Sequence, residues 1–80
     1  MKNKKNINIE FMRSIFKKAL NYKGKLSKNS KFENTQGWDS LGHMKIISEI
    51  EKNLKVSFEI DEIIGVNTVN KLITLVKNKL

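Results

Sequence analysis

The sequence predicts an all-α protein, a small four-helix bundle with three main helices, one short helix and a long loop between the first and second helices. Apolar residues recur at helical spacing in three stretches, and each stretch follows a residue type that commonly caps a helix. The alternating stretch "LKVSFEI" has no partner strand in the chain, and an isolated strand is unstable. We expect residues 1–80 to form a single domain, because a chain of 80 residues builds one modest core.

The first helix is expected over about residues 8–22. Asn8 is a suitable N-cap, Glu10 lies in the first turn, where the helix dipole favours an acid, and Gly24 is expected to end the helix. Residues 1–7 are basic and are expected to be flexible. The apolar stripe of this helix consists of Ile9, Phe11, Met12, Ile15, Phe16, Ala19 and Leu20.

Residues 24–37 contain turn formers but no sustained period, which indicates a long loop. Leu26 and Phe32 are expected to anchor this loop on the core. A second helix is expected to begin at Asp39 or Ser40, since both are capping residue types. Its apolar residues are Leu41, Met44, Ile46, Ile47, Ile50 and Leu54.

After the second helix we expect an extended connector and then a short helical turn over residues 61–64, ended by Gly65. Thr68 is expected to cap the last helix, and lysines at its end complement the negative end of its dipole. The expected core consists of Phe11, Ile15, Phe16, Leu41, Met44, Ile47, Ile50, Val69, Leu72, Ile73 and Val76.

The formal charge of +8 suggests nucleic acid or an anionic membrane as a partner. The distribution of this charge changes the interpretation. Residues 1–31 contain ten Lys or Arg residues and one acid, whereas residues 33–62 contain seven acids and three lysines. The basic character therefore belongs to the N-terminal part, and the neighbourhood of Ser40 is locally acidic.

Composition excludes several classes of site. With no cysteine and one histidine, His43, the chain offers neither a disulfide framework nor a metal site built from thiolates or clustered histidines. The basic start is like that of a signal peptide, but Glu10, Arg13, Lys17 and Lys18 interrupt the apolar residues that follow. No apolar run approaches the length that spans a membrane. We expect a cytoplasmic protein that does not insert into membranes.

The stretch "GWDSLGHM", residues 37–44, contains the three residue types of a hydrolase triad in Asp39, Ser40 and His43. Triad residues normally converge from separate parts of a fold, and nothing nearby forms an obvious oxyanion hole. We therefore expect no catalytic residue here, and we interpret His43 as a partly exposed helix residue.

Two other interpretations of Ser40 remain. It can be a plain N-cap, the commonest reason for a serine after a glycine-containing turn. Alternatively, a hydroxyl at a helix N-terminus is a suitable place to attach a phosphodiester, because free backbone amides and the positive end of the dipole stabilise the anion. A serine used in this way needs no base from its own chain, since a separate enzyme supplies one.

Residues 37–76 resemble the acyl carrier protein family, and the likeness covers essentially the whole chain, more loosely before Phe32. The family signature is Asp-Ser-Leu at the head of the second helix, with a glycine before it, an aromatic anchor in the first loop and a Thr-Val opening of the last helix. The matching residues are Phe32, Gly37, Asp39, Ser40, Leu41, Thr68 and Val69, with Trp38 as in stand-alone carriers.

The resemblance implies that Ser40 carries 4'-phosphopantetheine, transferred from coenzyme A by a phosphopantetheinyl transferase. The terminal thiol of this group then holds an acyl or aminoacyl group as a thioester, so a chain without cysteine gains a thiol. Asp39 and Leu41 match positions beside the attachment site. The implied partners are acyl or aminoacyl ligases, synthases and transferases, with partner contacts at Trp38, Leu41, Met44 and Lys45.

The charge departs from the family pattern, because members are usually acidic and present carboxylates on the second helix. Here Lys45 and Lys52 lie among Glu49 and Glu51. Gly42 is expected to weaken the second helix by roughly 1 kcal/mol relative to alanine, and so to loosen its first turn. The unusual charge favours a specialised lipid or secondary pathway over primary fatty acid biosynthesis.

The sequence thus predicts a monomeric, non-catalytic acyl carrier protein. Two alternatives remain. A basic helical module could bind nucleic acid through the N-terminal lysines, and its affinity would then fall steeply with salt. A scaffold with the carrier fold could lack the prosthetic group, and modification of Ser40 would then fail.

Overall fold

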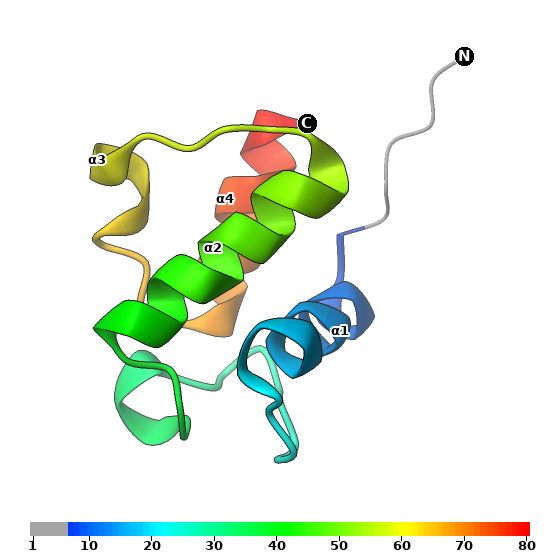
Figure 1. Ribbon diagram of the computed structural model, residues 1–80, viewed down its shortest axis with the longest axis vertical. Helices are drawn as coiled ribbons and strands as arrows, with labels where there is room; N and C mark the ends of the chain where they lie inside the picture. Colours follow the sequence, from blue (N-terminus) through cyan, green and yellow to red (C-terminus); the bar gives the residue numbers. More distant parts are fainter. Residues whose placement is uncertain (1–6) are drawn as a thin grey trace.

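The computed structural model describes residues 7–80, and within them the chain forms four α-helices and one short 3₁₀ helix. α1 packs against α2 and against α4, and the connector after α2 runs across to α3, on the side of the molecule away from α1 (Figure 1). These described residues contain no strand, so the predicted all-α class is confirmed. The helices are α1 (Ile9–Leu20), η1 (Phe32–Asn34), α2 (Ser40–Leu54), α3 (Ile60–Ile63) and α4 (Val69–Lys79).

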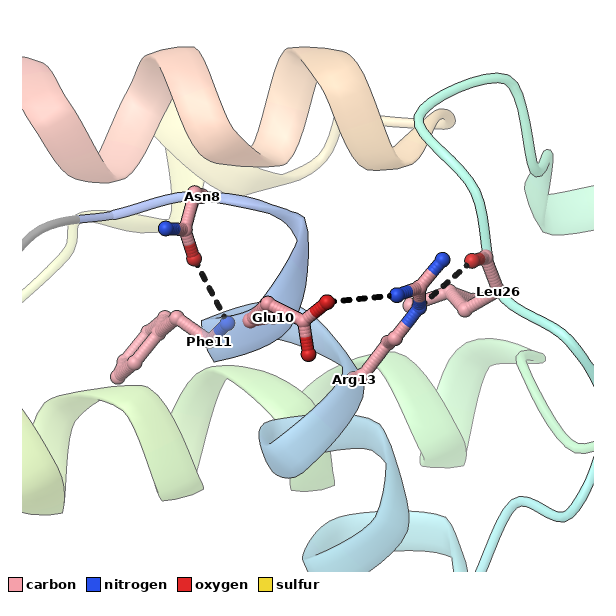
Figure 2. A network of polar contacts seen from close by, with 5 residues as sticks. All are labelled: Asn8, Glu10, Phe11, Arg13 and Leu26. Atoms are coloured by element: carbon pink, nitrogen blue, oxygen red, sulfur yellow. Dashed lines mark hydrogen bonds and ion pairs between the residues drawn. The ribbon is translucent and has the colours of Figure 1, made fainter.

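α1 begins as predicted and ends earlier than predicted. Asn8 caps its start, with its Oδ1 accepting the amide of Phe11 at 3.1 Å (Figure 2). The helix stops at Asn21, which takes a left-handed conformation with φ of 56°. Asparagine tolerates this conformation better than most residues, so Gly24 is not needed to end the helix. Of the N-terminal segment expected to be flexible, residues 1–6 lie outside the described residues, and Ile7 is buried in the core.

One arginine ties the loop after α1 to the helix itself. Arg13 donates from Nε to the carbonyl oxygen of Leu26 at 3.1 Å and from a second guanidinium nitrogen to Glu10 at 2.9 Å (Figure 2). Leu26 is buried and Phe32 is half-buried against the core, so both predicted loop anchors are confirmed.

The long loop is more ordered than the sequence indicated, because it contains η1 and pairs with the start of α4. The amide of Val69 donates to the carbonyl of Ser30 at 3.0 Å, and the amide of Phe32 donates to the carbonyl of Asn67 at 2.8 Å. The first of these bonds gives a partner to a first-turn amide of α4, which has no acceptor within its own helix. The two segments stabilise each other's backbone.

The core differs from the prediction on α2. The side chains of Leu41 and Met44 were expected in the core, but they are 67% and 46% exposed. The inward stripe of α2 instead runs through Gly42, His43, Ile46, Ile47 and Ile50. The buried apolar residues are Ile7, Met12, Ile15, Phe16, Leu26, Trp38, Ile46, Ile47, Ile50, Ile63, Val69, Leu72, Ile73 and Val76, with Phe11 partly buried against them.

The remaining caps follow the prediction closely. Asp39 caps α2, and Thr68 caps α4 by accepting the amide of Lys71 on its Oγ1 at 3.1 Å. The short helix α3 begins one residue before the predicted turn. Its Glu62 accepts the amide of Glu59 at 2.7 Å and forms an ion pair with Lys79 of α4 at 3.0 Å. This carboxylate therefore connects α3 to the end of the last helix.

We expect acid to weaken this connection. The amide of Glu59, followed by the ammonium of Lys79, holds the pKa of Glu62 below its ordinary value of 4.5. Because the pKa is lower in the folded state, Glu62 stabilises the fold above pH 4.5, and the contribution is lost as pH falls through the folded pKa. Thermal unfolding should show wild type more stable than Glu62→Gln at neutral pH, with the difference shrinking in acid. The same substitution at the exposed neighbour, Asp61→Asn, should give no such pattern, and a constant Glu62→Gln difference would contradict the prediction.

Candidate functional site

Ser40 is the first residue of α2, and its side chain is exposed. Asp39 is the N-cap, because its Oδ1 accepts the amide of Gly42 at 2.8 Å and its carbonyl accepts the amide of His43 at 2.7 Å. The interpretation of Ser40 as a plain N-cap is therefore wrong. Among the described residues the Ser40 hydroxyl makes no hydrogen bond, and neither does the amide of Ser40 or that of Leu41. The start of α2 presents a free hydroxyl beside two free amides.

His43 is not the partly exposed residue that the sequence suggested, because only 7% of it is accessible to solvent. Its Nε2 lies 2.9 Å from the carbonyl oxygen of Ile63, which can only accept, so Nε2 carries the proton. Its Nδ1 accepts the indole N–H of Trp38 at 2.9 Å. Both ring nitrogens are thus engaged, and Asp39 is engaged as a cap, so these residues do not form a triad with Ser40.

Trp38 was predicted to contact partners, and this prediction is wrong because the side chain is only 2% exposed. Its ring packs edge-on against the rings of Phe16 on α1 and Phe32 on η1, with distances between ring centroids of 5.0 Å and 5.9 Å. It also stacks on the ring of His43, with a centroid distance of 6.0 Å. The aromatic cluster, which consists of Trp38, His43, Phe16 and Phe32, joins α1, the loop and α2. One signal in the sequence could have predicted that both side chains are buried. The tryptophan lies five residues before the sole histidine, and the indole N–H of one can donate to a ring nitrogen of the other.

Gly42 allows the backbone of Gly37 to pack closely against α2, a role that its low helix propensity does not indicate. A β-carbon on this residue would overlap the backbone carbonyl oxygen of Gly37 and lie 3.1 Å from the side chain of Leu20. Gly37 itself has a φ of +86°, a conformation that favours glycine. The two glycines let the loop before Ser40 lie directly on α2. Whether Gly42 loosens the first turn of α2 stays a prediction, which amide exchange tests.

An apolar groove opens beside Ser40, between the start of α2 and α3. Its volume is about 310 Å³, and no charged side chain lines it. Exposed apolar side chains gather around it, with Met44 from α2 and Ile60 and Ile64 from α3 in the lining and Leu41 next to Ser40. The lining residues are Phe32, Ser40, His43, Met44, Ile60, Ile63, Ile64, Val66 and Asn67.

Other classes of site are not supported within the described residues. Residues 7–80 contain no group of three or more His, Cys, Asp or Glu side chains placed to hold a metal ion. None of the helices there combines the length and the apolar character needed to cross a membrane.

The features at the start of α2 fit a phosphate-linked prosthetic group. The free hydroxyl is an attachment point, the free amides and the dipole of α2 favour an anion there, and the neighbouring groove can receive an apolar chain. No charged side chain of the groove would be buried by such a chain. Lys45 is exposed one turn further along α2, so it is accessible to a partner, as Leu41 and Met44 are.

Comparisons with known proteins agree with this fit. The family model described as "Phosphopantetheine attachment site" matches residues 10–76. The solution structure of a holo acyl carrier protein from Geobacter metallireducens is similar, with 26% sequence identity, a TM-score of 0.79 and coverage of 89% of this chain and 83% of that one. A search of curated proteins found no match. The chain belongs to the phosphopantetheine attachment family, as a protein of the acyl carrier type whose prosthetic group is 4'-phosphopantetheine.

Proposed function

We propose that this protein holds acyl or aminoacyl groups as thioesters on a 4'-phosphopantetheine attached to Ser40, and that it delivers them between biosynthetic enzymes. The observation that carries the proposal is the uncommitted, exposed hydroxyl of Ser40 at the head of α2, beside an apolar groove. The prosthetic group supplies a thiol, which a chain without cysteine lacks. We further propose that the protein works as a monomer in the cytoplasm and is not itself a catalyst.

In the attachment reaction, the chain contributes the hydroxyl that accepts the phosphopantetheine and an electrostatic field that favours an anion. It contributes no general base. The Ser40 oxygen forms a bond to phosphorus as the pyrophosphate bond of coenzyme A breaks, and adenosine 3',5'-bisphosphate leaves. The hydroxyl proton passes to a base of the phosphopantetheinyl transferase. His43 cannot be this base, because its two ring nitrogens are bonded to Trp38 and Ile63. The amides of Ser40 and Leu41 lie at the positive end of the α2 dipole, where they favour the new phosphodiester anion.

The groove supports a role in sheltering cargo. Most of its lining residues are apolar, so burying an apolar chain against them is favourable by roughly 25 cal/mol per Å². Its volume of about 310 Å³ is near the lower end of the range of small-molecule pockets. This size favours short or partly exposed acyl groups over long ones, in agreement with a specialised pathway rather than primary fatty acid synthesis.

The exposed apolar residues Leu41 and Met44 support partner contacts on the same face as Ser40. An enzyme that loads or unloads the thiol must approach this face, and apolar side chains near the centre of a contact contribute most when they become fully desolvated. We therefore assign both to contacts with the transferase and with ligases or synthases.

The intact mass of the purified protein tests the attachment. After incubation with coenzyme A and a broadly tolerant phosphopantetheinyl transferase, wild type should gain the mass of one phosphopantetheine, and Ser40→Ala should gain none. Ser48→Ala, an exposed serine further along α2, is the matched control and should gain the mass as wild type does. A folded wild type that gains nothing would instead support the scaffold without a prosthetic group or, if it binds duplex DNA in a salt-dependent manner, the basic module.

A further inference from the structure

We propose that the carrier docks through a basic surface beside Ser40 onto enzymes that present carboxylates around their active-site entrance. This inference rests on the proposed carrier function and adds the chemistry of the partner. The surface, called the basic face below, surrounds the end of α1 and the start of α2. Its cationic residues are Arg13, Lys17, Lys18, Lys23, Lys25 and Lys45.

The basic face is continuous from the attachment site to the loop. A shallow depression next to Ser40 is lined by Lys18 and Leu20 from α1 and by Asp39, Leu41 and Lys45 from the start of α2. A second depression shares Leu20 with the first and extends over the loop after α1. A third overlaps the second and adds the remaining cations of the loop and of α1. The three depressions therefore adjoin one another from the start of α2 to the loop after α1, and each has at least one cation in its lining.

The cations of the basic face are largely available for a partner. Within residues 7–80 the ion pairs are those of Arg13 with Glu10 and of Lys79 with Glu62, so none of the five lysines of the face is paired there. The one acid in the three linings is Asp39, whose Oδ1 is committed to capping α2. A surface of this kind attracts anionic groups and steers their approach.

The acids of α2 lie elsewhere. Along the helix axis Lys45 is about 7 Å from Ser40, whereas Glu49, the first acid of α2, is about 14 Å away. The groove on the other side of Ser40 has no charged side chain in its lining. Ser40 is therefore flanked by an apolar groove on one side and by cations on the other, and the one carboxylate in these two linings is the helix cap Asp39.

The mixture of residue types favours a protein partner over a membrane or nucleic acid. Leu41 is 67% exposed, and in the depression it lies with Lys18 and Lys45 and the side chain of Leu20. An apolar centre with a charged rim is the usual composition of a protein interface. A phosphate backbone gains nothing from an exposed leucine and is repelled by Asp39, so the chemistry fits a surface with both carboxylates and apolar side chains.

The test uses the isotope-labelled holo protein and a synthetic helical peptide in which glutamate and leucine residues form an amphipathic pattern. We expect amide shifts centred on Lys18, Leu41 and Lys45 during titration. The double variant Lys18→Glu/Lys45→Glu should bind the peptide about tenfold more weakly or worse. The matched control Lys52→Glu/Lys55→Glu makes the same charge change at exposed positions at the far end of α2 and should stay within about twofold of wild type.

A third variant separates docking from general attraction between opposite charges. Leu41→Ala leaves the charge intact and, because Leu41 is exposed, leaves the fold intact, yet it should weaken peptide binding severalfold. Equal binding by wild type, the two charge variants and Leu41→Ala would overturn the proposal. So would shifts of these amides by phosphatidylglycerol vesicles or duplex DNA but not by the peptide. Failure of the proposed function is seen separately, as the absence of phosphopantetheine mass on Ser40.

Discussion

Replacement of His43 by alanine is expected to lower the free energy of unfolding by about 2–4 kcal/mol. The substitution removes two buried hydrogen bonds, to the indole of Trp38 and to the carbonyl of Ile63. It leaves the indole N–H without its acceptor, and an unsatisfied buried group costs about 1–3 kcal/mol. The carbonyl of Ile63 keeps the amide of Val66 as a donor at 3.2 Å. Urea denaturation followed by circular dichroism measures the loss, and the fluorescence of Trp38, the sole tryptophan, reports on the same cluster.

Two comparisons decide whether the loss comes from the Trp38–His43 contact. In a Trp38→Phe background the indole donor is already absent, so adding His43→Ala should cost at least about 1 kcal/mol less than it does in wild type. Met44→Ala changes the neighbouring, half-exposed side chain and should cost under about 1 kcal/mol. Equal, small losses for His43→Ala and Met44→Ala would contradict the buried network.

Gly42→Ala is the second substitution with a large expected effect, and its sign is opposite to that predicted by helix propensity. In an exposed helix interior this change stabilises by about 1 kcal/mol. Here the added β-carbon would overlap the carbonyl oxygen of Gly37, a backbone atom that cannot turn away as a flexible side chain can. Overpacking of this kind costs about 1–3 kcal/mol, and after subtraction of the gain of about 1 kcal/mol from helix propensity we expect a net loss of up to about 2 kcal/mol.

The matched control for this prediction is Gly65→Ala, because a β-carbon there meets nothing within 4 Å. This variant should be neutral or slightly more stable, since alanine restricts the unfolded chain. The midpoint temperatures of thermal unfolding of the two variants should therefore shift from that of wild type in different directions or by clearly different amounts. A Gly42→Ala protein as stable as Gly65→Ala would show that the loop before Ser40 does not press on α2.

Local signals were sufficient to predict the four α-helices of this fold, but not η1. Asn8, Asp39 and Thr68 each cap a helix, and a cap acts through hydrogen bonds within a few residues. The end of α1 was less predictable, because Asn21 and Gly24 are both residues that can end a helix and the sequence alone does not rank them. The position of Ser40 at the head of α2 followed from the same short-range rules.

The surroundings of Ser40 could not be predicted in this way, because residues distant in sequence create them. Trp38 is buried because Phe16 of α1 and Phe32 of η1 cover its faces. His43 can be buried because the carbonyl of Ile63, on α3, accepts a hydrogen bond from its Nε2–H. These contacts rotate the inward stripe of α2, which exposes Leu41 and Met44 although their spacing is compatible with a core position.

The bridge between Lys31 and Thr68 joins two segments that are far apart in sequence, and it encloses α2, Ser40 and α3 in a closed ring of chain. Closing a ring of this length costs conformational entropy before its contacts compensate for it. We therefore expect α1 and α2 to pair early in folding and the loop to join α4 late. A protease cut in the connector between α2 and α3 would leave the bridge between Lys31 and Thr68 intact. The two fragments of the cleaved protein should therefore stay associated in one folded unit.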